Sequence, residues 1–179
     1  MEYIDIYDSD GKSLGIKKTR GEVHKEGLWH KTVHVWVVNP RGEILIQKRS
    51  PYVDNHPNQW DISAAGHISA GENDTTAALR ETEEEIGLKL SPDDLIKIGT
   101  VKQMSVRDGY INNEINSVYL VRTNLELENI KKQEDEVTAL KFITCKELQR
   151  FIESKDSSFV PHPEEFTLLF NYLTKADQG

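Results

Sequence analysis

The sequence has almost no cysteine, no long hydrophobic run and fewer basic than acidic residues. Its single cysteine among 179 residues, Cys145, excludes an internal disulfide and fits a reducing compartment. No apolar run is long enough to span a membrane, and the acidic start Met1-Glu2-Tyr3 does not resemble a secretory signal. The net charge of −8 argues against nucleic acid as a partner. We therefore expect a cytoplasmic protein with no nucleic-acid and no membrane partner.

The length suits one domain, residues 1–179, with a sizeable core. Apolar alternation and turn residues predict an N-terminal hairpin at 3–18, and residues 20–31 form a polar segment. Helical periodicity predicts a helix at 73–86 and two C-terminal helices between 144 and 174. Further strands are expected at 32–38, 44–47, 60–63, 96–105, 115–122 and 137–143, with 44–47 paired to 32–38. Strands on both sides of one helix, with a terminal helix for the other sheet face, predict an α/β/α sandwich.

The central helix carries a cluster of carboxylates. Asn73 or Asp74 supplies its N-cap oxygen and Gly87 stands at the position of a C-terminal cap. Residues three and four apart lie on one helix face, so the three glutamates at 81, 84 and 85 are neighbours. Like charges repel, and a cation relieves the repulsion. Magnesium prefers oxygen ligands, usually a few carboxylates plus substrate phosphates.

Residues around the carboxylates support this interpretation. Arg80 can pair with one of the acids and hold its rotamer. Gly66 and Gly71 allow a sharp loop whose backbone can approach a metal ion or a phosphate. Taken alone, the run Glu83-Glu84-Glu85 would be interpreted as the solvated end of an acidic helix. The spacing of the whole stretch argues against that simpler interpretation.

The stretch from Gly66 to Leu88 resembles the Nudix box. That motif is glycine, five residues, glutamate, seven residues, then Arg-Glu-apolar-any-Glu-Glu-any-Gly-apolar. Thr82 is the one departure, at a position usually aliphatic, and a small stability effect is expected from its hydroxyl. The resemblance implies the Nudix-type α/β/α sandwich with a mixed β-sheet. It also implies Mg²⁺, with Mn²⁺ as a substitute, at metal-site residues Glu81, Glu84, Glu85 and Gly66, with Glu72 as a helper.

The flanking sequence is similar to one branch of this superfamily, isopentenyl diphosphate isomerase. His24, His30 and His67 match histidines of its metal site, and Glu114 matches the second of two glutamates, whereas Asn112 replaces the first. The isomerase places its proton-donating cysteine just before the box glycine, where this chain has Ala65. Alanine has no transferable proton, so the resemblance favours a hydrolase over an isomerase. Whether the three histidines form a second metal site stays open, and His34 and His162 are interpreted as structural.

The expected reaction is hydrolysis of the diphosphate bond in a nucleoside diphosphate linked to another group. The candidates for the general base are Glu84, Glu114, Glu134 and Glu136. Of these we favour Glu84 or Glu114 as the catalytic residue. Glu134 and Glu136 lie in an acidic stretch that is typically solvated. Lys48, Arg49 and His67 are the expected contacts to substrate phosphate, although a basic strand end explains the first two equally well.

Two alternatives remain open at this point. One is an isomerase-like enzyme, and the other is a non-catalytic module that senses a nucleotide. Such modules often lose box glutamates, and this chain retains them all. The sequence does not identify the diphosphate, because the loops that choose the leaving group cannot be interpreted from one chain. A homodimer is expected from the family resemblance alone.

Overall fold

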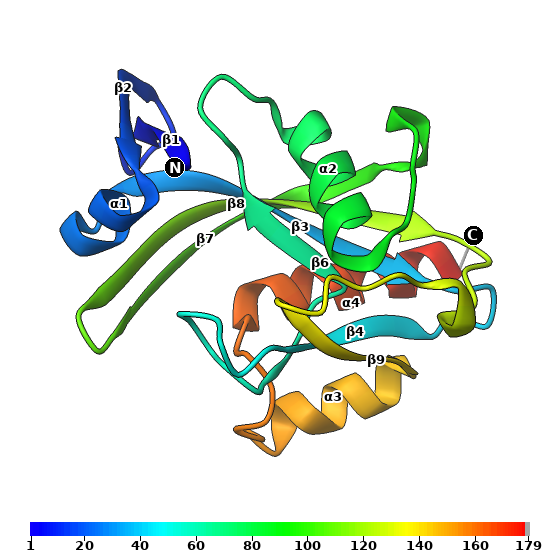
Figure 1. Ribbon diagram of the computed structural model, residues 1–179. Coiled ribbons are helices and arrows are strands. Elements are labelled where there is room, and N and C mark those ends of the chain that lie inside the picture. The colour runs from blue at the N-terminus through cyan, green and yellow to red at the C-terminus, as the bar shows by residue number, and fades with distance from the viewer. Residues whose placement is uncertain (178–179) are drawn as a thin grey trace.

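A mixed β-sheet with helices on both faces forms the centre of the computed structural model, which describes residues 1–177 (Figure 1). The strands are β1 (Tyr3–Tyr7), β2 (Ser13–Thr19), β3 (Trp29–Val38), β4 (Ile44–Arg49), β5 (Trp60–Asp61), β6 (Ala64–His67), β7 (Ile96–Arg107), β8 (Tyr110–Arg122) and β9 (Val137–Ile143). The helices are α1 (Arg20–Glu26), α2 (Asp74–Ile86), α3 (Cys145–Glu153) and α4 (Pro163–Asp177), and single 3-10 turns lie at Pro92–Asp94 and Leu127–Asn129. None of the helices in this described part is both long and apolar enough to cross a bilayer.

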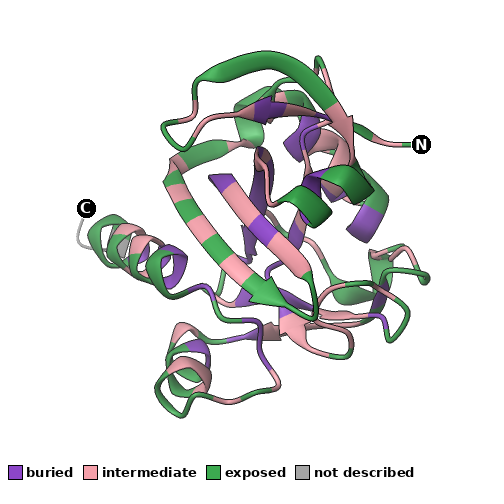
Figure 2. Ribbon diagram, turned by 90° about the vertical axis from the view of Figure 1, so that its left-hand side faces the viewer, coloured by how far each residue is buried: buried purple, intermediate pink, exposed green. Residues whose placement is uncertain are grey.

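Strand β3 is the axis of the sheet. It runs parallel to β8 from Trp29 to Val38 and antiparallel to β6. Successive side chains of a strand point to opposite faces. Val33, Val35 and Val37 accordingly pack in the cluster that includes α2, whereas Trp36 packs in the cluster that includes α3 and α4. Buried residues concentrate in these central strands (Figure 2). The expected layers, helix on sheet on helix, are therefore present.

The expected pairing of 44–47 with 32–38 is wrong apart from one contact. Only Val38 and Ile44 pair, next to the turn in which Gly42 donates its amide to the Asn39 carbonyl. A strand can pair along two edges, and both edges of β3 are occupied mainly by β8 and β6. Strand β4 turns away and pairs with β5 and β9 instead. Glu85 of α2 accepts hydrogen bonds from Gln47 of β4 and from Ala65 of β6 and so connects the two strands.

The polar segment at 20–31 contains structure that we did not expect. Thr19 and Glu22 form a reciprocal capping box that starts α1, and Gly27 ends the helix in the left-handed conformation. Strand β8 also starts earlier than expected, because Asp108 and Gly109, both with positive φ, form a tight turn that joins it to β7. Both differences matter for the site, since they place His24 on α1 and Glu114 within β8.

Candidate functional site

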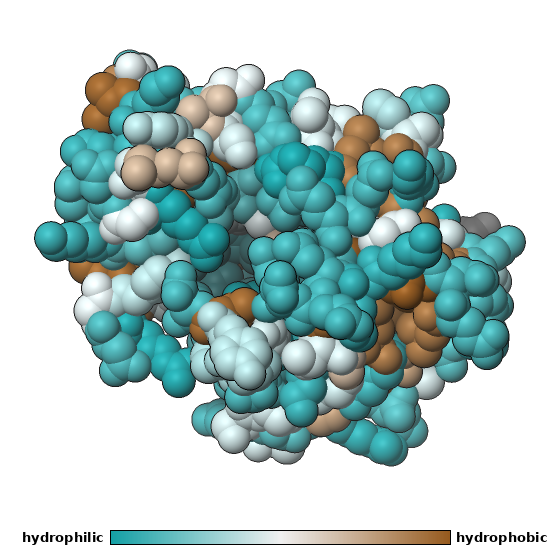
Figure 3. All heavy atoms as spheres, viewed as in Figure 1, coloured by the Kyte–Doolittle hydropathy of each residue, from teal (hydrophilic) through white to brown (hydrophobic). Residues whose placement is uncertain are grey.

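A cavity of about 410 Å³ opens beside β6, between the end of α2 and the start of α4. Its wall draws on β3, β6, β7, β8 and α2, so most of it is built from regular elements. The face of the molecule in Figure 3 is hollowed near its centre, where hydrophilic side chains gather. Charged and polar side chains dominate the wall, including the box glutamates at 81, 84 and 85. Such a lining suits a polar, charged ligand.

Helix α2 forms where the sequence predicts it and carries the glutamates into the cavity. Asn73 caps it by accepting the amide of Thr76, and Gly87 ends it with φ of 65°. Glu85 is buried, and its Oε2 accepts from Gln47 Nε2 (2.7 Å) and from the Ala65 amide (3.1 Å). These two donors fix the carboxylate against β6. Glu84 stays half exposed, with 53% of its side chain accessible.

Two of the glutamates are costly to ionise in this protein without a cation. Burial, together with the negative charge of Glu81, raises the pKa of Glu85 to about 8. Burial likewise raises the pKa of Glu81 to about 7, against the opposing charge of Arg80. Since each of these carboxylates opposes ionisation of the other, a divalent cation between them would relieve both. The charge pattern therefore fits the donor set that magnesium prefers.

Gly66 lies directly against the carboxylate of Glu81. A Cβ added to Gly66 would overlap the carboxyl carbon and both oxygens of that side chain. No other residue type leaves space for the carboxylate in this position. The glycine therefore allows the Glu81 carboxylate of α2 to lie directly against the backbone of β6. The sequence predicted an approach of this backbone to a metal ion or a phosphate, which stays a prediction.

Arg80 connects the loop after β6 to the helix. It donates to both carboxylate oxygens of Glu72, to Glu81 Oε1 (2.6 Å) and to the backbone carbonyl of His67 (3.0 Å). Glu72 in turn accepts the Ser69 amide. The expected pairing of Arg80 with one acid is thus a larger network, in which Glu72 holds the loop. The Thr82 hydroxyl bonds back to the Ala78 carbonyl (2.6 Å), as expected for this departure from the motif.

The two basic residues at the end of β4, Lys48 and Arg49, are placed differently. Arg49 lines the cavity, but its guanidinium donates to Asp61 Oδ2 (3.2 Å) and to the Asn55 carbonyl (2.9 Å). Lys48 does not belong to the cavity wall. These two bonds use only two of the five N–H donors of the guanidinium, so Arg49 retains donors for a phosphate, and the role of Lys48 stays a prediction.

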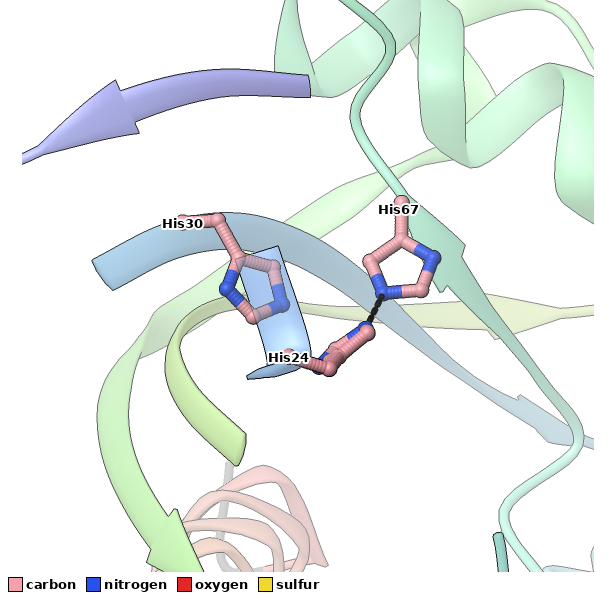
Figure 4. Close-up of side chains that lie close together, drawn as sticks. All are labelled: His24, His30 and His67. Carbon is pink, nitrogen blue, oxygen red and sulfur yellow. Dashed lines mark hydrogen bonds between the residues drawn. The ribbon is translucent and has the colours of Figure 1, made fainter. Parts of the chain in front are cut away.

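The three histidines from different elements meet beside the cavity (Figure 4). His24 comes from α1, His30 from β3 and His67 from β6, and one nitrogen of each lies within 4.8 Å of the others. His24 Nε2 and His67 Nε2 are hydrogen-bonded at 3.2 Å. Tyr110 stacks on His24 with ring centroids 4.1 Å apart. The early start of β8 puts Tyr110 there.

This histidine cluster fits a metal ion better than the sequence indicated. His24 and His30 each place Nδ1 on a backbone carbonyl, of Ile111 and Leu28, which leaves Nε2 toward the cluster. His30 Nε2 and Asn112 Oδ1 are buried without a hydrogen-bond partner among the described residues. Burial lowers the pKa of His24 to about 4, with a further contribution from His30. Neutral imidazoles with fixed outer nitrogens suit zinc or a similar transition metal, rather than magnesium.

The candidate bases separate in space. Glu114 lines the cavity with 14% of its side chain exposed, and its Oε1 lies 3.8 Å from His30 Nε2. Glu136 also lines the cavity, and its charge contributes to the raised pKa of both Glu81 and Glu85. Glu134 is not part of the wall and pairs with Lys132 instead. Glu84, Glu114 and Glu136 are therefore the candidates within reach of a bound substrate.

A second polar cluster was not identified from the sequence. It consists of His34, Asp61 and His162 in the cavity wall and Glu165 behind them, and we call this part of the wall the cavity floor. His34 Nδ1 lies 2.6 Å from Glu165 Oε2, and Trp36 Nε1 donates to Glu165 Oε1 at 2.8 Å. His162 bonds to Asp61 Oδ1 at 2.8 Å. Glu165 is 131 positions from His34 in the sequence, and no local pattern links them. The sequence interpreted His34 and His162 as structural, which stays a prediction, and it did not identify their partners Glu165 and Asp61.

The comparisons with known proteins agree on one family. The NUDIX domain family matches residues 28–163. Nudix hydrolase 3 of Arabidopsis thaliana is 41% identical over 184 residues, which cover 99% of this chain but only 24% of the plant protein. An uncharacterised Nudix hydrolase of Clostridium acetobutylicum is 39% identical over 157 residues, covering 86% of this chain and 75% of that protein. Isopentenyl-diphosphate Delta-isomerases of two bacteria also match, at 23% and 28% identity.

Solved structures give the same fold. The crystal structure of DR0079 from Deinococcus radiodurans has a TM-score of 0.68 at 18% identity, and the match covers 95% of this chain and 98% of that one. At this identity the likeness concerns the fold alone, and it confirms the expected α/β/α sandwich with a mixed sheet. The curated relatives with 39–41% identity are named Nudix hydrolases. Together with a family match over most of the sequence, this shows that the chain belongs to the NUDIX domain family.

Proposed function

We propose that the protein is a magnesium-dependent hydrolase that cleaves the diphosphate bond of a nucleoside diphosphate linked to another moiety. It acts as one domain in the cytoplasm, on a small-molecule diphosphate, without nucleic-acid or membrane partners. Homodimer formation stays a prediction from family resemblance. Mn²⁺ is the expected substitute for Mg²⁺.

One observation carries the proposal: Glu81 and Glu85 are both desolvated and interact electrostatically, and Glu81 lies against a glycine that has no space for a side chain. Without a cation, this arrangement is unfavourable in an aqueous cavity. Glu81, Glu85 and the backbone of Gly66 would hold the metal, with Glu84 as the most exposed contributor. Bound there, Mg²⁺ would neutralise phosphate charge and lower the pKa of a bound water.

The surrounding residues then have distinct roles in our proposal. Arg80 keeps Glu81 and the loop of Glu72 in place, since it bonds to both. Glu84 or Glu114 takes the proton of the attacking water, because both line the cavity. The water oxygen bonds to one phosphorus while the bridging P–O bond breaks, so that two phosphate-bearing products form. Arg49 and His67 contact phosphate oxygens from the cavity wall.

The test is a substrate panel with magnesium. Nucleoside di- and triphosphates, ADP-ribose, other nucleotide sugars, dinucleoside polyphosphates and isopentenyl diphosphate are each incubated with wild type and two variants. Glu85→Gln should lose about 100-fold or more in turnover, equivalent to about 2.7 kcal/mol of transition-state stabilisation. Glu83→Gln is the matched control, because Glu83 is an exposed residue of the same helix that pairs with Lys89. It should retain wild-type activity.

The isomerase is the second candidate, and the assembled cluster of His24, His30 and His67 favours it. Against it, Ala65 places a methyl group where the isomerase has its proton donor. Isomerised isopentenyl diphosphate in the panel would decide for this candidate. If no compound turns over but nucleotides bind tightly, the hydrolase proposal is wrong and a sensor module takes its place.

A further inference from the structure

The cavity floor contains a buried ion pair between His34 and Glu165, in which the histidine is the partner that lines the cavity. His34 on β3 and Glu165 on α4 are both buried, and their closest atoms, Nδ1 and Oε2, are 2.6 Å apart. The second oxygen of Glu165 accepts from Trp36 Nε1. Burial alone would lower the pKa of the His34 imidazole, but the adjacent Glu165 carboxylate raises it to about 9. His34 is therefore an imidazolium at neutral pH.

The positive end of this pair faces the cavity. His34 belongs to the cavity wall, whereas Glu165 lies behind it with 1% of its surface exposed. Within residues 1–177, His34 forms a hydrogen bond only through Nδ1. Its Nε2 has no hydrogen bond but does not count among the fully buried unpaired atoms, so it is accessible from the cavity. Nε2–H is consequently a free, charged donor at the cavity floor. Glu165 compensates the buried charge on one edge of the ring, and the N–H on the other edge is left for a ligand in the cavity.

The position of His34 relates it to the Nudix box. It pairs across the β3–β6 ladder with Ala65, and Ala65 precedes Gly66 and donates its amide to Glu85. The donor therefore lies on the strand next to the proposed metal site. If the box glutamates hold one phosphate of a diphosphate through a metal ion, the second phosphate or its substituent lies in the same cavity. His34 at the cavity floor is then in a position to bind it.

A cation is the other ligand that two histidines and a carboxylate could attract, since His34, His162 and Glu165 also lie within 4.8 Å of one another. The existing bonds oppose it. His162 uses Nδ1 for Gln103 Oε1 (3.0 Å) and Nε2 for Asp61 Oδ1 (2.8 Å). His34 uses Nδ1 for Glu165. A metal ion would have to break these bonds and displace protons from a charged imidazole. An anion needs no rearrangement.

We propose that His34 is a substrate-binding residue, whose Nε2–H donates a charged hydrogen bond to a phosphate oxygen while Glu165 holds the opposite edge of the ring. This inference deepens the proposed function and rests on it for the phosphate chemistry of the ligand. Glu165 is a positioning residue, because it reaches the substrate only through His34. One charge-assisted hydrogen bond corresponds to about a tenfold change in affinity or more.

The experiment measures binding of inorganic pyrophosphate to the full chain in EDTA at pH 7, by isothermal titration calorimetry. His34→Asn keeps a donor toward Glu165 and removes the cavity-facing nitrogen. We expect about tenfold weaker binding. His56→Asn is the matched control: His56 also lines the cavity, bonds through Nδ1 to Gln59, and has a positive φ that asparagine tolerates. It should bind pyrophosphate as wild type does.

Two further measurements distinguish the loss of a substrate contact from a folding defect in His34→Asn. Glu165→Gln retains His34 and should weaken pyrophosphate binding by a similar factor, because the imidazole loses its counter-charge. In wild type, ¹⁵N shifts of the His34 ring should report an imidazolium whose Nε2 signal moves when pyrophosphate is added. Unchanged affinity in His34→Asn, an equal loss in His56→Asn, or a neutral His34 would overturn the proposal.

The outcome is separable from that of the hydrolase proposal. Pyrophosphate binding in EDTA requires neither metal nor turnover. If the panel yields no product but His34→Asn still loses affinity, the hydrolase proposal fails and the anion subsite stands. If the panel identifies a substrate whose KM is unaffected by His34→Asn, the hydrolase proposal stands and the subsite is wrong.

Discussion

At the scale of single residues, Gly66 decides how closely β6 approaches the Glu81 carboxylate. A methyl group at Gly66 would occupy the space of that carboxylate, so Gly66→Ala must displace it. We expect magnesium-dependent turnover to fall by about tenfold or more, and the free energy of unfolding to fall by about 1–3 kcal/mol. Steady-state assays and urea denaturation measure the two effects.

The control for this prediction is Gly21→Ala. Gly21 lies in α1, its added Cβ meets nothing within 4 Å, and its φ is not positive. Alanine should stabilise the helix there by about 0.5–1 kcal/mol without altering turnover. Equal losses of turnover in both variants would contradict the role given to Gly66.

Residues of the box could be predicted from the sequence because their spacing encodes one helix face. Helical periodicity was enough to place Glu81 and Glu85 on one face, whereas their role as metal ligands was implied by the family resemblance and stays a prediction. The packing of Gly66 against Glu81 was not predicted, since the sequence indicated only that this backbone could approach a metal ion or a phosphate. The His34–Glu165 pair was not predicted either, because the fold brings together two residues that carry no local signal. Buried polar pairs of this kind depend on tertiary structure alone.

At the scale of elements, α1 positions His24 for the histidine cluster. Its start depends on the capping box, in which Thr19 accepts the Glu22 amide. Thr19→Ala should destabilise the protein by about 1 kcal/mol and loosen the helix that holds His24. We expect weaker zinc binding at the cluster, seen as a smaller zinc-induced rise in the thermal midpoint.

Helix α3 offers the matched control, since Thr144 and Glu147 form the same capping box far from the cluster in sequence. Thr144→Ala should cost similar stability and leave the zinc-induced shift unchanged. If both variants lose the shift equally, the effect of Thr19 is general rather than local. If neither does, α1 does not control the cluster.

Elements with strong local sequence signals were predicted well, whereas the pairing of strands within the sheet was not. Helix α2 and strand β9 lie where periodicity and caps placed them. Helix α1 was missed because its seven residues include only one buried apolar side chain, Val23, although its capping box was visible in the sequence. The pairing of β4 was wrong because sequence neighbours are the default partners, whereas β3 already has β6 and β8.

At the scale of the whole molecule, the buried His34–Glu165 pair links stability to pH. The folded pKa of His34, about 9, lies above the model-peptide value of 6.5. Folded protein therefore retains a proton that the unfolded chain releases. The stabilisation is complete below pH 6.5 and is lost as the pH rises through about 9. The pKa of Glu165 is lowered, so its contribution is present above the ordinary carboxylate range and lost on acidification.

Other groups titrate in the same window, so the prediction concerns a difference between two proteins. Glu81 and Glu85, with pKa values of about 7 and 8, also bind protons in the folded state that the unfolded chain has released. Glu165→Gln leaves those two residues unchanged and removes the counter-charge of His34. We expect the free energy of unfolding, measured by urea denaturation in EDTA, to fall more steeply between pH 6.5 and 9 in wild type than in this variant. Parallel curves would mean that His34 does not retain its proton at neutral pH, and His34 could then not offer a charged donor to an anion in the cavity.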